Sequence, residues 1–391
     1  MIAEFTIGRH TRRNPVGAFK KLGSGWFPPL IGLWGVMCGV MILSFYLVVA
    51  GWTFGYVFEE IFYFAGLTAA SEWVADLGNG FKNALFAVLF MAATIAIITG
   101  GVSNGIERAT KTMMPILIVV LVIMIIYVFT LQGSMDGLRL YLLPDFTAIN
   151  TNLVFSALGQ AFFSLSLGMG ALLTYGSYLK KNQNIVESAV YVTLADVGIA
   201  FLAGLLIIPA MFVAQYSGIT IMGEDGRLFA STTLVFDVLP NLFKSMGGAF
   251  GLLFGTSFFI LLSMAALTST ISLLEVPVSY IIDEHKVPRK KAAIGVGGVV
   301  MIFAIIVALN ISLIDVLVTI FNNVGLPLGG LMLCVFLAWF WKSENAMDEI
   351  RHGYDNMDQG LFPKIWPFFV TYICPLLIAV VLGTTLYNLL S

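Results

Sequence analysis

Long apolar stretches recur from one end of the chain to the other. The runs at residues 115–131 and 366–390 are continuous and show no alternation of apolar and polar positions, which is typical of helices rather than of the strands of a membrane barrel. In a bilayer each backbone N–H and C=O must be paired within its own segment, and a helix of about 20 apolar residues meets that requirement. The pattern predicts nine membrane-spanning helices, at residues 28–60, 83–100, 112–132, 150–178, 187–213, 248–282, 293–309, 314–341 and 365–389. We therefore expect an all-α integral membrane protein in which residues 1–391 form one transmembrane domain.

The composition supports this expectation and excludes several classes of function. Hydrophobic residues make up 59% of the chain and charged residues 11%, whereas a typical soluble protein has about 25% charged residues. The net charge of −2 and the scattered basic residues exclude nucleic acid as a partner. Cys38, Cys334 and Cys374 show no CxxC spacing, which favours packing roles over a disulfide or a zinc site. The three histidines lie near predicted loops and no nucleophile–base pairing is evident, so we expect no enzyme activity.

Basic residues are unevenly divided between alternate loops of the predicted spans. Sixteen of the twenty fall on one side, namely Arg9, Arg12, Arg13, Lys20, Lys21, Arg108, Lys111, Lys180, Lys181, Lys286, Arg289, Lys290, Lys291, Lys342, Arg351 and Lys364. The opposite loops hold Lys82, Arg139, Arg227 and Lys244. Cytoplasmic loops are enriched in lysine and arginine. The distribution therefore predicts a multi-pass protein of the cell membrane (inner or plasma), with a cytoplasmic N-terminus and an extracellular or periplasmic C-terminus.

The centre of the predicted span at 150–178 is rich in glycine and serine, with Ser164-Leu165-Ser166-Leu167-Gly168-Met169-Gly170 inside an apolar helix. Glycine costs about 1 kcal/mol relative to alanine in a helix, and serine competes for backbone groups. A break near Ser166 to Gly168 would free backbone groups in mid-membrane to contact a ligand or an ion. Close packing of helices through small residues is the alternative, and the pattern alone leaves both open.

Two other spans carry polar groups that suit a cation. The span at 248–282 contains Leu267-Thr268-Ser269-Thr270-Ile271-Ser272, whose hydroxyl oxygens suit a monovalent cation, although serine and threonine also bond to the carbonyl one turn earlier. Asp196 lies in the apolar span at 187–213. An ionised carboxylate there is costly unless paired, so Asp196 is predicted to bind a cation or a proton; a hydrogen-bonded structural aspartate is the alternative.

Several separate motifs, in the right order, carry a resemblance to a known family. They are Ala3-Glu4-Phe5-Thr6-Ile7-Gly8-Arg9, Gly105-Ile106-Glu107-Arg108, the stretch from Gly159-Gln160 to Gly170, Thr174-Tyr175-Gly176-Ser177-Tyr178 and Leu267-Thr268-Ser269-Thr270. Over essentially its whole length the chain resembles the bacterial branch of the neurotransmitter:sodium symporter family. The resemblance implies a leucine-transporter-type bundle with inverted repeats, with the first helix and most of the second missing from this sequence. It also implies sodium-coupled symport of an amino acid by alternating access.

The resemblance assigns substrate contacts to particular residues. Tyr46 matches the tyrosine whose hydroxyl binds the substrate carboxylate, and Phe163 matches the aromatic side chain that closes over the bound amino acid. The other positions that match the substrate pocket are Ile42, Ser164, Ser166, Met169, Ser269 and Leu273. These make an apolar slot, so a neutral or hydrophobic amino acid is the expected substrate.

The resemblance also implies ion sites. The sodium ligands expected are Ser164, Asp196, the carbonyl of Ala265, and the hydroxyls of Thr268 and Ser269. Gln160, Ser164 and Asp196 correspond to the region where chloride-dependent members bind their anion. A fixed carboxylate at Asp196 supplies the negative charge itself, so we expect sodium as the coupling ion and no chloride requirement.

The resemblance also implies gate residues and an oligomeric state. Tyr178 and Asp283 resemble the latch that holds the inner gate shut, with Phe163 as the outer cover, while interfacial anchoring is the alternative role for the first two. A homodimer in the bilayer is compatible with the family. The alternatives for function are a truncated, transport-inactive or regulatory member of the same fold, or another cation-coupled carrier.

Overall fold

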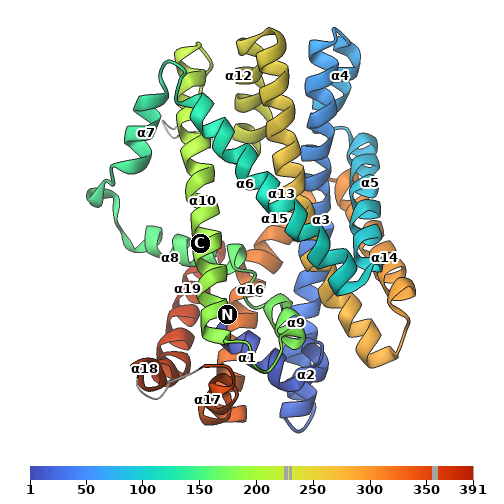
Figure 1. Cartoon of the computed structure of the whole chain (residues 1–391), viewed down its shortest axis with the longest axis vertical. Coiled ribbons are helices and arrows are strands. Elements are labelled where there is room, and N and C mark those ends of the chain that lie inside the picture. Colours follow the sequence, from blue (N-terminus) through green and yellow to red (C-terminus); the bar gives the residue numbers. More distant parts are fainter. Residues whose placement is uncertain (224–227, 229–230, 355–359, 391) are drawn as a thin grey trace.

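The computed structural model describes residues 1–223, 228, 231–354 and 360–390, and these residues form a bundle of helices (Figure 1). The described part contains no β-strand, only an isolated antiparallel bridge between Met222 and Leu228. The all-α architecture predicted from the apolar pattern is confirmed.

Eight helices in the described part are long and apolar enough to cross a membrane. They are α3 (Phe27–Phe64), α5 (Gly80–Thr99), η1 with α6 (Val102–Val128), α10 (Ile185–Tyr216), α13 (Gly248–His285), α14 (Arg289–Leu309), the run from α15 to α17 (Ser312–Arg351) and the run from α18 into α19 (Phe362–Leu389). Each overlaps one of the predicted ranges. The remaining range, 150–178, is divided into α8 (Thr151–Ser164) and α9 (Ala171–Tyr178).

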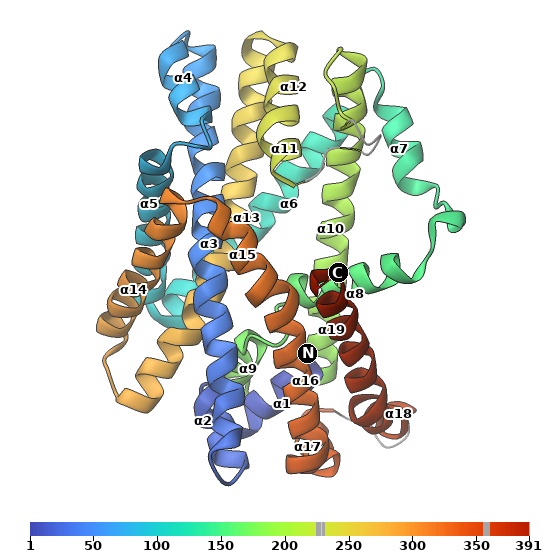
Figure 2. The ribbon, with the colours of Figure 1, turned by 180° about the vertical axis from the view of Figure 1, so that it is seen from behind.

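Shorter elements connect these helices or subdivide them. They are α1 (Ile2–Thr11), α2 (Pro15–Leu22), α4 (Thr68–Ala75), η1 (Val102–Glu107), α6 (Arg108–Val128), α7 (Ser134–Leu142), η2 (Phe146–Ala148), α11 (Ser231–Thr233), η3 (Leu234–Val238), α12 (Leu239–Met246), α15 (Ser312–Leu317), η4 (Val318–Gly325), α16 (Leu326–Val335), η5 (Phe336–Lys342), α17 (Ser343–Arg351), α18 (Phe362–Phe368), η7 (Phe369–Ile373) and α19 (Cys374–Leu390). Most long helices follow the long axis of the molecule, whereas α8 runs across it near mid-height (Figures 1 and 2). Arg227, which belongs to the predicted external loops, lies outside the described residues.

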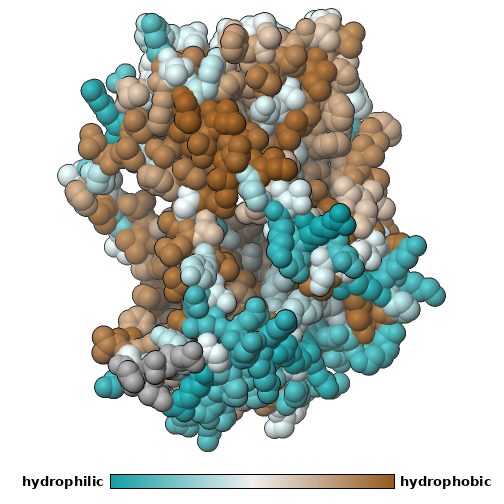
Figure 3. Space-filling view, in the orientation of Figure 1, coloured by the Kyte–Doolittle hydropathy of each residue, from teal (hydrophilic) through white to brown (hydrophobic). Residues whose placement is uncertain are grey.

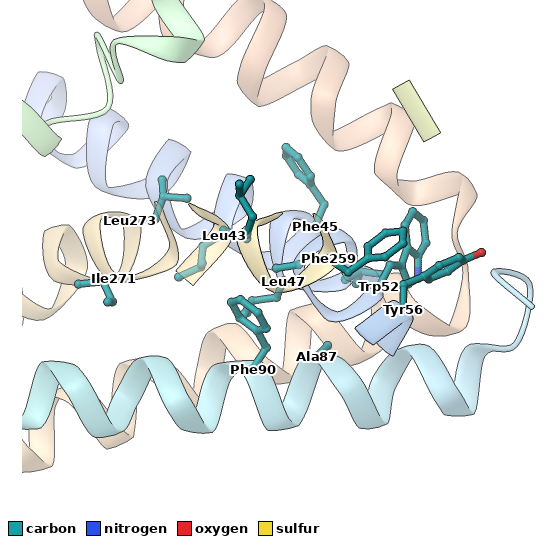
Figure 4. Packing of buried hydrophobic residues seen from close by; sticks show 14 of the residues in the cluster. Leu43, Phe45, Leu47, Trp52, Tyr56, Ala87, Phe90, Phe259, Ile271 and Leu273 are labelled. Carbon is teal, nitrogen blue, oxygen red and sulfur yellow. The ribbon is translucent and has the colours of Figure 1, made fainter. Parts of the chain in front are cut away.

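The centre of the bundle is the contact of α3 with α5 and α13. Figure 4 shows Phe90 of α5 directed toward Leu47 of α3, beside side chains of α13. Because lipid is as apolar as these side chains, the helices are held by close van der Waals packing and by hydrogen bonds. Trp52 of α3 donates its Nε1–H to Asn83 Oδ1 of α5 at 2.8 Å, and no water competes for this buried pair.

The outer surface agrees with a membrane environment. On α6 the apolar side chains of Ile123 and Ile126 are 58% and 62% exposed, as expected for helices that face lipid. Figure 3 shows a largely hydrophobic upper half, a hollow near mid-height and a hydrophilic lower end. The protein is therefore built to lie across a bilayer with its long axis near the membrane normal.

The short helix α1 is fixed to the bundle by a buried arginine. Arg9 is fully buried, and its Nε lies 2.7 Å from Glu349 Oε1 of α17. Its Nη1 donates to the carbonyl of Gln183 at 2.5 Å, and its Nη2 donates to the carbonyl of Glu349. The guanidinium of Arg9, here called the fork of Arg9, thus joins α1 to α17 and to the segment that precedes α10.

α1 also packs closely against α9, at a position where Gly176 has no side chain to keep the two backbones apart. A Cβ at Gly176 would lie 2.8 Å from the carbonyl oxygen of Phe5 and 2.9 Å from its Cα, so backbone would have to move. We expect Gly176→Ala to lower the free energy of unfolding by about 1–3 kcal/mol through overpacking. Gly198→Ala on α10 meets nothing within 4 Å and serves as the control. Thermal unfolding of the detergent-solubilised variants measures the difference; equal midpoints would show that α1 and α9 do not need this contact.

Candidate functional site

The helix predicted over residues 150–178 is interrupted where glycine and serine are dense. It ends at Ser164, and the chain is not helical again until Ala171. Gly168 and Gly170 have φ angles of 81° and 77°, which glycine adopts without a steric penalty. Ser166 has a φ of 53°, a conformation that costs a non-glycine residue about 1–2 kcal/mol. Of the two alternatives that the sequence pattern left open, the structure shows the break.

The interruption forms one wall of a cavity of about 410 Å³. The other walls come from α3, α6, α10 and α13. All the positions expected from the resemblance to contact substrate line it, namely Ile42, Tyr46, Phe163, Ser164, Ser166, Met169, Ser269 and Leu273. Asp196 and Thr268 line it as well. The two stretches near residues 166 and 268 therefore face a shared cavity.

A carboxylate and a hydroxyl form a pair inside this cavity. The Ser164 hydroxyl lies 2.7 Å from Asp196 Oδ1 and 2.9 Å from Oδ2, and so can donate to either oxygen. Neither lysine nor arginine is among the described residues that line the cavity. A negative charge without a basic partner suits a bound cation, because an isolated carboxylate in this setting is costly.

The hydroxyls of α13 have partners within their own helix. Thr268 Oγ1 donates to the carbonyl of Ala265 at 2.7 Å, and Ser269 Oγ lies 3.4 Å from the same oxygen. α13 is continuous through this stretch. The Ala265 carbonyl accepts these hydrogen bonds, and Ala265 itself does not line the cavity. A hydroxyl that donates its hydrogen keeps its oxygen lone pairs, so both side chains can still offer an oxygen to a cation while they are bonded to the Ala265 carbonyl.

The anion-site group expected from the resemblance is only partly assembled. Ser164 and Asp196 are in contact, but Gln160 lines a different cavity, between α8, η4, α16 and α19. Gln160 precedes Ser164 by one helical turn, about 5–6 Å along α8, where the neighbouring walls no longer include α10. Gln160 therefore does not share a cavity with Ser164 and Asp196 in this structure, and the expected anion site stays a prediction.

Tyr178 and Asp283, the two residues that the resemblance assigns to a latch, have different partners in the structure. The Tyr178 hydroxyl donates to Glu275 Oε1 at 2.7 Å. Asp283 Oδ2 instead accepts from the backbone N–H of Asn14 at 2.8 Å. Eight residues along α13 separate Glu275 from Asp283, a distance of about 12 Å, so one tyrosine cannot reach both.

Glu275 is the centre of an ion-paired cluster on α13, three residues after Ser272, which lines the cavity. It is fully buried, and its Oε2 lies 2.5 Å from Nη2 of Arg289. Arg289 Nε donates to the carbonyl of Ile98 at 2.9 Å, so the cluster joins α9, α13, α14 and α5. Glu275 was not among the expected site residues; a carboxylate within an apolar helix was the signal that could have identified it.

Thr110 and Met114 of α6 line the cavity but were not predicted. They lie between the motif Gly105-Ile106-Glu107-Arg108 and Pro115, in and just after the polar run Thr110-Lys111-Thr112. The packing of α6 against α10 and α13 brings them to the cavity.

Comparisons with known proteins agree with this geometry. A family model described as "Sodium:neurotransmitter symporter family" matches residues 59–390. The uncharacterized sodium-dependent transporter YhdH of Bacillus subtilis is 32% identical, over 97% of this chain and 85% of the relative. The uncharacterized sodium-dependent transporter MJ1319 of Methanocaldococcus jannaschii is 30% identical, over 100% of this chain and 80% of the relative. The crystal structure of MhsT in complex with L-phenylalanine has 37% sequence identity and a TM-score of 0.83, and the match covers 98% of this chain and 87% of MhsT.

The two tyrosines of α9 allow a test of the Glu275 cluster. Tyr178 donates to a carboxylate, whereas Tyr175 donates to the Ser272 hydroxyl at 3.1 Å. We expect Tyr178→Phe to lower the free energy of unfolding by about 1.5–3 kcal/mol and Tyr175→Phe by about 0.5–1.5 kcal/mol, because hydrogen bonds to charged groups contribute more. Thermal unfolding in detergent shows which of the two variants loses more stability. A larger loss for Tyr175→Phe would show that Tyr178 is not bonded to an ionised Glu275.

Proposed function

Because the chain belongs to the sodium:neurotransmitter symporter family, we propose that it carries a neutral or hydrophobic amino acid across the cell membrane together with sodium. Its membership makes it a multi-pass membrane protein and a sodium-dependent transporter rather than an enzyme. The observation that supports the proposed substrate is the cavity at the helix break, where a lone carboxylate, hydroxyls and apolar side chains converge.

The cavity offers separate contacts for the parts of an amino acid. Tyr46 presents a phenolic hydroxyl for the substrate carboxylate, while Ile42, Met169 and Leu273 surround an apolar side chain. Phe163 lies at the break and can cover the bound molecule. A substrate with a second carboxylate would find no basic partner among the described lining residues, which favours a neutral side chain. The MhsT structure with L-phenylalanine, 37% identical to this chain, supports the same class of substrate.

Sodium binding is proposed at the polar side of the cavity. Asp196 and Ser164 supply a carboxylate and a hydroxyl from α10 and α8, and Thr268, Ser269 and the Ala265 carbonyl supply oxygens from α13. Oxygen ligands of this kind suit a hard cation, and freed carbonyls at a broken helix add to them. A cation here neutralises Asp196 and attracts the substrate carboxylate. Sodium and amino acid would therefore bind cooperatively.

Alternating access then requires movement around the break. Loop-like residues 165–170 can absorb a change in the angle between α8 and α9, as hinge segments do. The Glu275 cluster joins four helices at the inner end, so we propose that it must separate before substrate leaves on that side. In this arrangement the fixed site is exposed first to one side of the membrane and then to the other.

We assign the basic end of the molecule to the cytoplasm. The elements that carry most of the basic residues, α1, α2, α17, α18 and the turn between α13 and α14, lie at the lower end in Figure 1. The elements α4, α7 and α12 lie at the opposite end. By the positive-inside rule we propose that the N-terminus lies in the cytoplasm; nine crossings would then put the C-terminus on the extracellular or periplasmic side.

Binding of labelled amino acid tests the proposed function. We expect the purified protein to bind labelled L-phenylalanine or L-leucine with sodium and much more weakly with potassium in its place. Tyr46→Phe should weaken binding about 10- to 150-fold, the equivalent of about 1.5–3 kcal/mol for a hydrogen bond to a carboxylate. Tyr191→Phe, at a side chain that is 64% exposed on α10, is the control. Sodium-independent binding, or equal affinity in Tyr46→Phe, would contradict the assignment.

Ion replacement tests the role of Asp196. We expect sodium-driven uptake into proteoliposomes to be unchanged when gluconate replaces chloride, because Asp196 already supplies a fixed negative charge beside Ser164. Asp196→Asn should raise the sodium concentration for half-maximal uptake about tenfold, equivalent to ~1.4 kcal/mol. Asp136→Asn, at an exposed position of α7, should have no effect. A strict chloride requirement in the unmodified protein would contradict chloride independence.

A further inference from the structure

Two adjacent glutamates, Glu59 and Glu60, are buried near the end of α3, and the function proposed above makes no use of them. Glu59 has partners on two other helices. Its Oε1 accepts from the Ser71 hydroxyl of α4 at 2.8 Å and lies 2.7 Å from Nζ of Lys244 on α12. Figures 1 and 2 show α4 and α12 at the end of the molecule opposite α2 and α17. The pair therefore lies at the end that we assign to the outside.

Glu60 has no partner among the residues that the structure describes. Its side chain is fully buried, and neither of its carboxyl oxygens accepts a hydrogen bond. The backbone of α13 packs against this carboxyl at Gly255, where a Cβ would lie 2.5 Å from Glu60 Cδ. An ionised carboxylate enclosed in this way is costly, because it has lost its hydration and gained no donor. The burial of Glu60 thus calls for a cation that the described residues do not supply.

The charges around the two glutamates leave room for one bound positive charge. The titratable groups that face them are Tyr56 and Tyr63 of α3, Asp237 of η3 and Lys244 of α12, while α4 presents Ser71 and α13 presents Gly255. Among these described residues only Lys244 is basic. One ammonium cannot neutralise two carboxylates, and neighbouring carboxylates resist double ionisation.

A proton suits this position better than a metal ion. A hard metal cation takes about six oxygen ligands, which need space around the ion, whereas the Glu60 carboxyl packs against backbone. Three of the four carboxyl oxygens of the two glutamates have no donor, so a hydrogen on Glu60 supplies a donor where acceptors are in excess. We propose that Glu60 is a binding site for one proton, taken from water at the α12 end of the molecule and held while Lys244 is paired with Glu59.

Release of this proton would act on the contact between α3 and α12. An ionised Glu60 would place a second negative charge beside Glu59, with Lys244 as the shared counter-charge. Like charges repel when both are buried, so we expect α12 to separate from α3 and admit water. The proton therefore keeps α12 docked on the end of α3. This inference does not depend on which solute the central cavity carries.

Infrared difference spectroscopy tests the bound proton without any transport assay. A protonated carboxyl has a C=O stretching band that is separate from the bands of a carboxylate and that shifts in D₂O. We expect Glu60→Gln at neutral pH to lose the band of one carboxyl, because the carboxamide keeps the shape of the side chain without its proton. Glu72→Gln, at an exposed position of α4, is the control and should keep the band. If Glu60→Gln does not elute as a single species, Glu60→Met takes its place.

An unchanged carboxyl band in Glu60→Gln would show that Glu60 is ionised and would overturn the proposal. Loss of the band on addition of sodium chloride at fixed pH would assign the position to a metal ion and overturn it too. In the unmodified protein the band should disappear reversibly as the pH is raised. A band that stays until the protein unfolds would show a fixed structural carboxyl instead of a proton site.

Hydrogen exchange tests the effect of the proton on α12. At one alkaline pH, we expect residues 239–246 to exchange faster in the unmodified protein than in Glu60→Gln, which is neutral at every pH. Residues 289–309 of α14 are the internal reference and should exchange alike in both proteins. Equal rates for residues 239–246 would show that the proton does not hold α12 on α3.

Discussion

Pairing of backbone hydrogen bonds in lipid is the constraint on which this structure depends. A helix broken in mid-membrane exposes N–H and C=O groups that lipid cannot satisfy. Here protein replaces the missing partners: the N–H of Gly168 donates to Glu4 Oε1 of α1 at 2.8 Å. A Cβ at Gly168 would collide with the backbone of Leu326 on α16, so the broken segment is enclosed on two sides. The break is therefore a supported feature of the fold, and α1 and α16 together set where α8 ends and α9 begins.

Placement of the break determines the chemistry around it. α8 ends at Ser164, and the hydroxyl of this last helical residue reaches Asp196 on α10. The same turn brings Phe163, Ser166 and Met169 to face Thr268 and Ser269 on α13. A polar side and an apolar side then share one cavity. A zwitterion with an apolar side chain needs such a division, since its charged and uncharged parts require opposite surroundings.

Much of this arrangement was predictable from the sequence, for identifiable reasons. The apolar runs are long enough to specify helices such as α3 and α13 without ambiguity, and the Gly168 and Gly170 positions require φ angles that interrupt a helix. Side-chain partners were less predictable. Tyr178 bonds to Glu275 and Asp283 accepts from Asn14, because these partners depend on how α9 and α2 pack against α13, which no local pattern specifies. Thr110 and Met114 belong to a short stretch of threonine, lysine and methionine whose sequence does not show which side faces a cavity, and the packing of α6 against α10 and α13 decides it.

The fork of Arg9 has a consequence for the order of folding. Its partner Glu349 lies 340 residues further along the chain. At synthesis rates of about 5–20 residues per second, roughly 15–70 s pass between the two residues leaving the ribosome. During that interval the guanidinium must stay hydrated or bind lipid phosphate, since burial without its carboxylate is costly. The contact between Arg9 and Glu349 therefore forms only after α17 has been made, so α1 docks on its final partners late in folding.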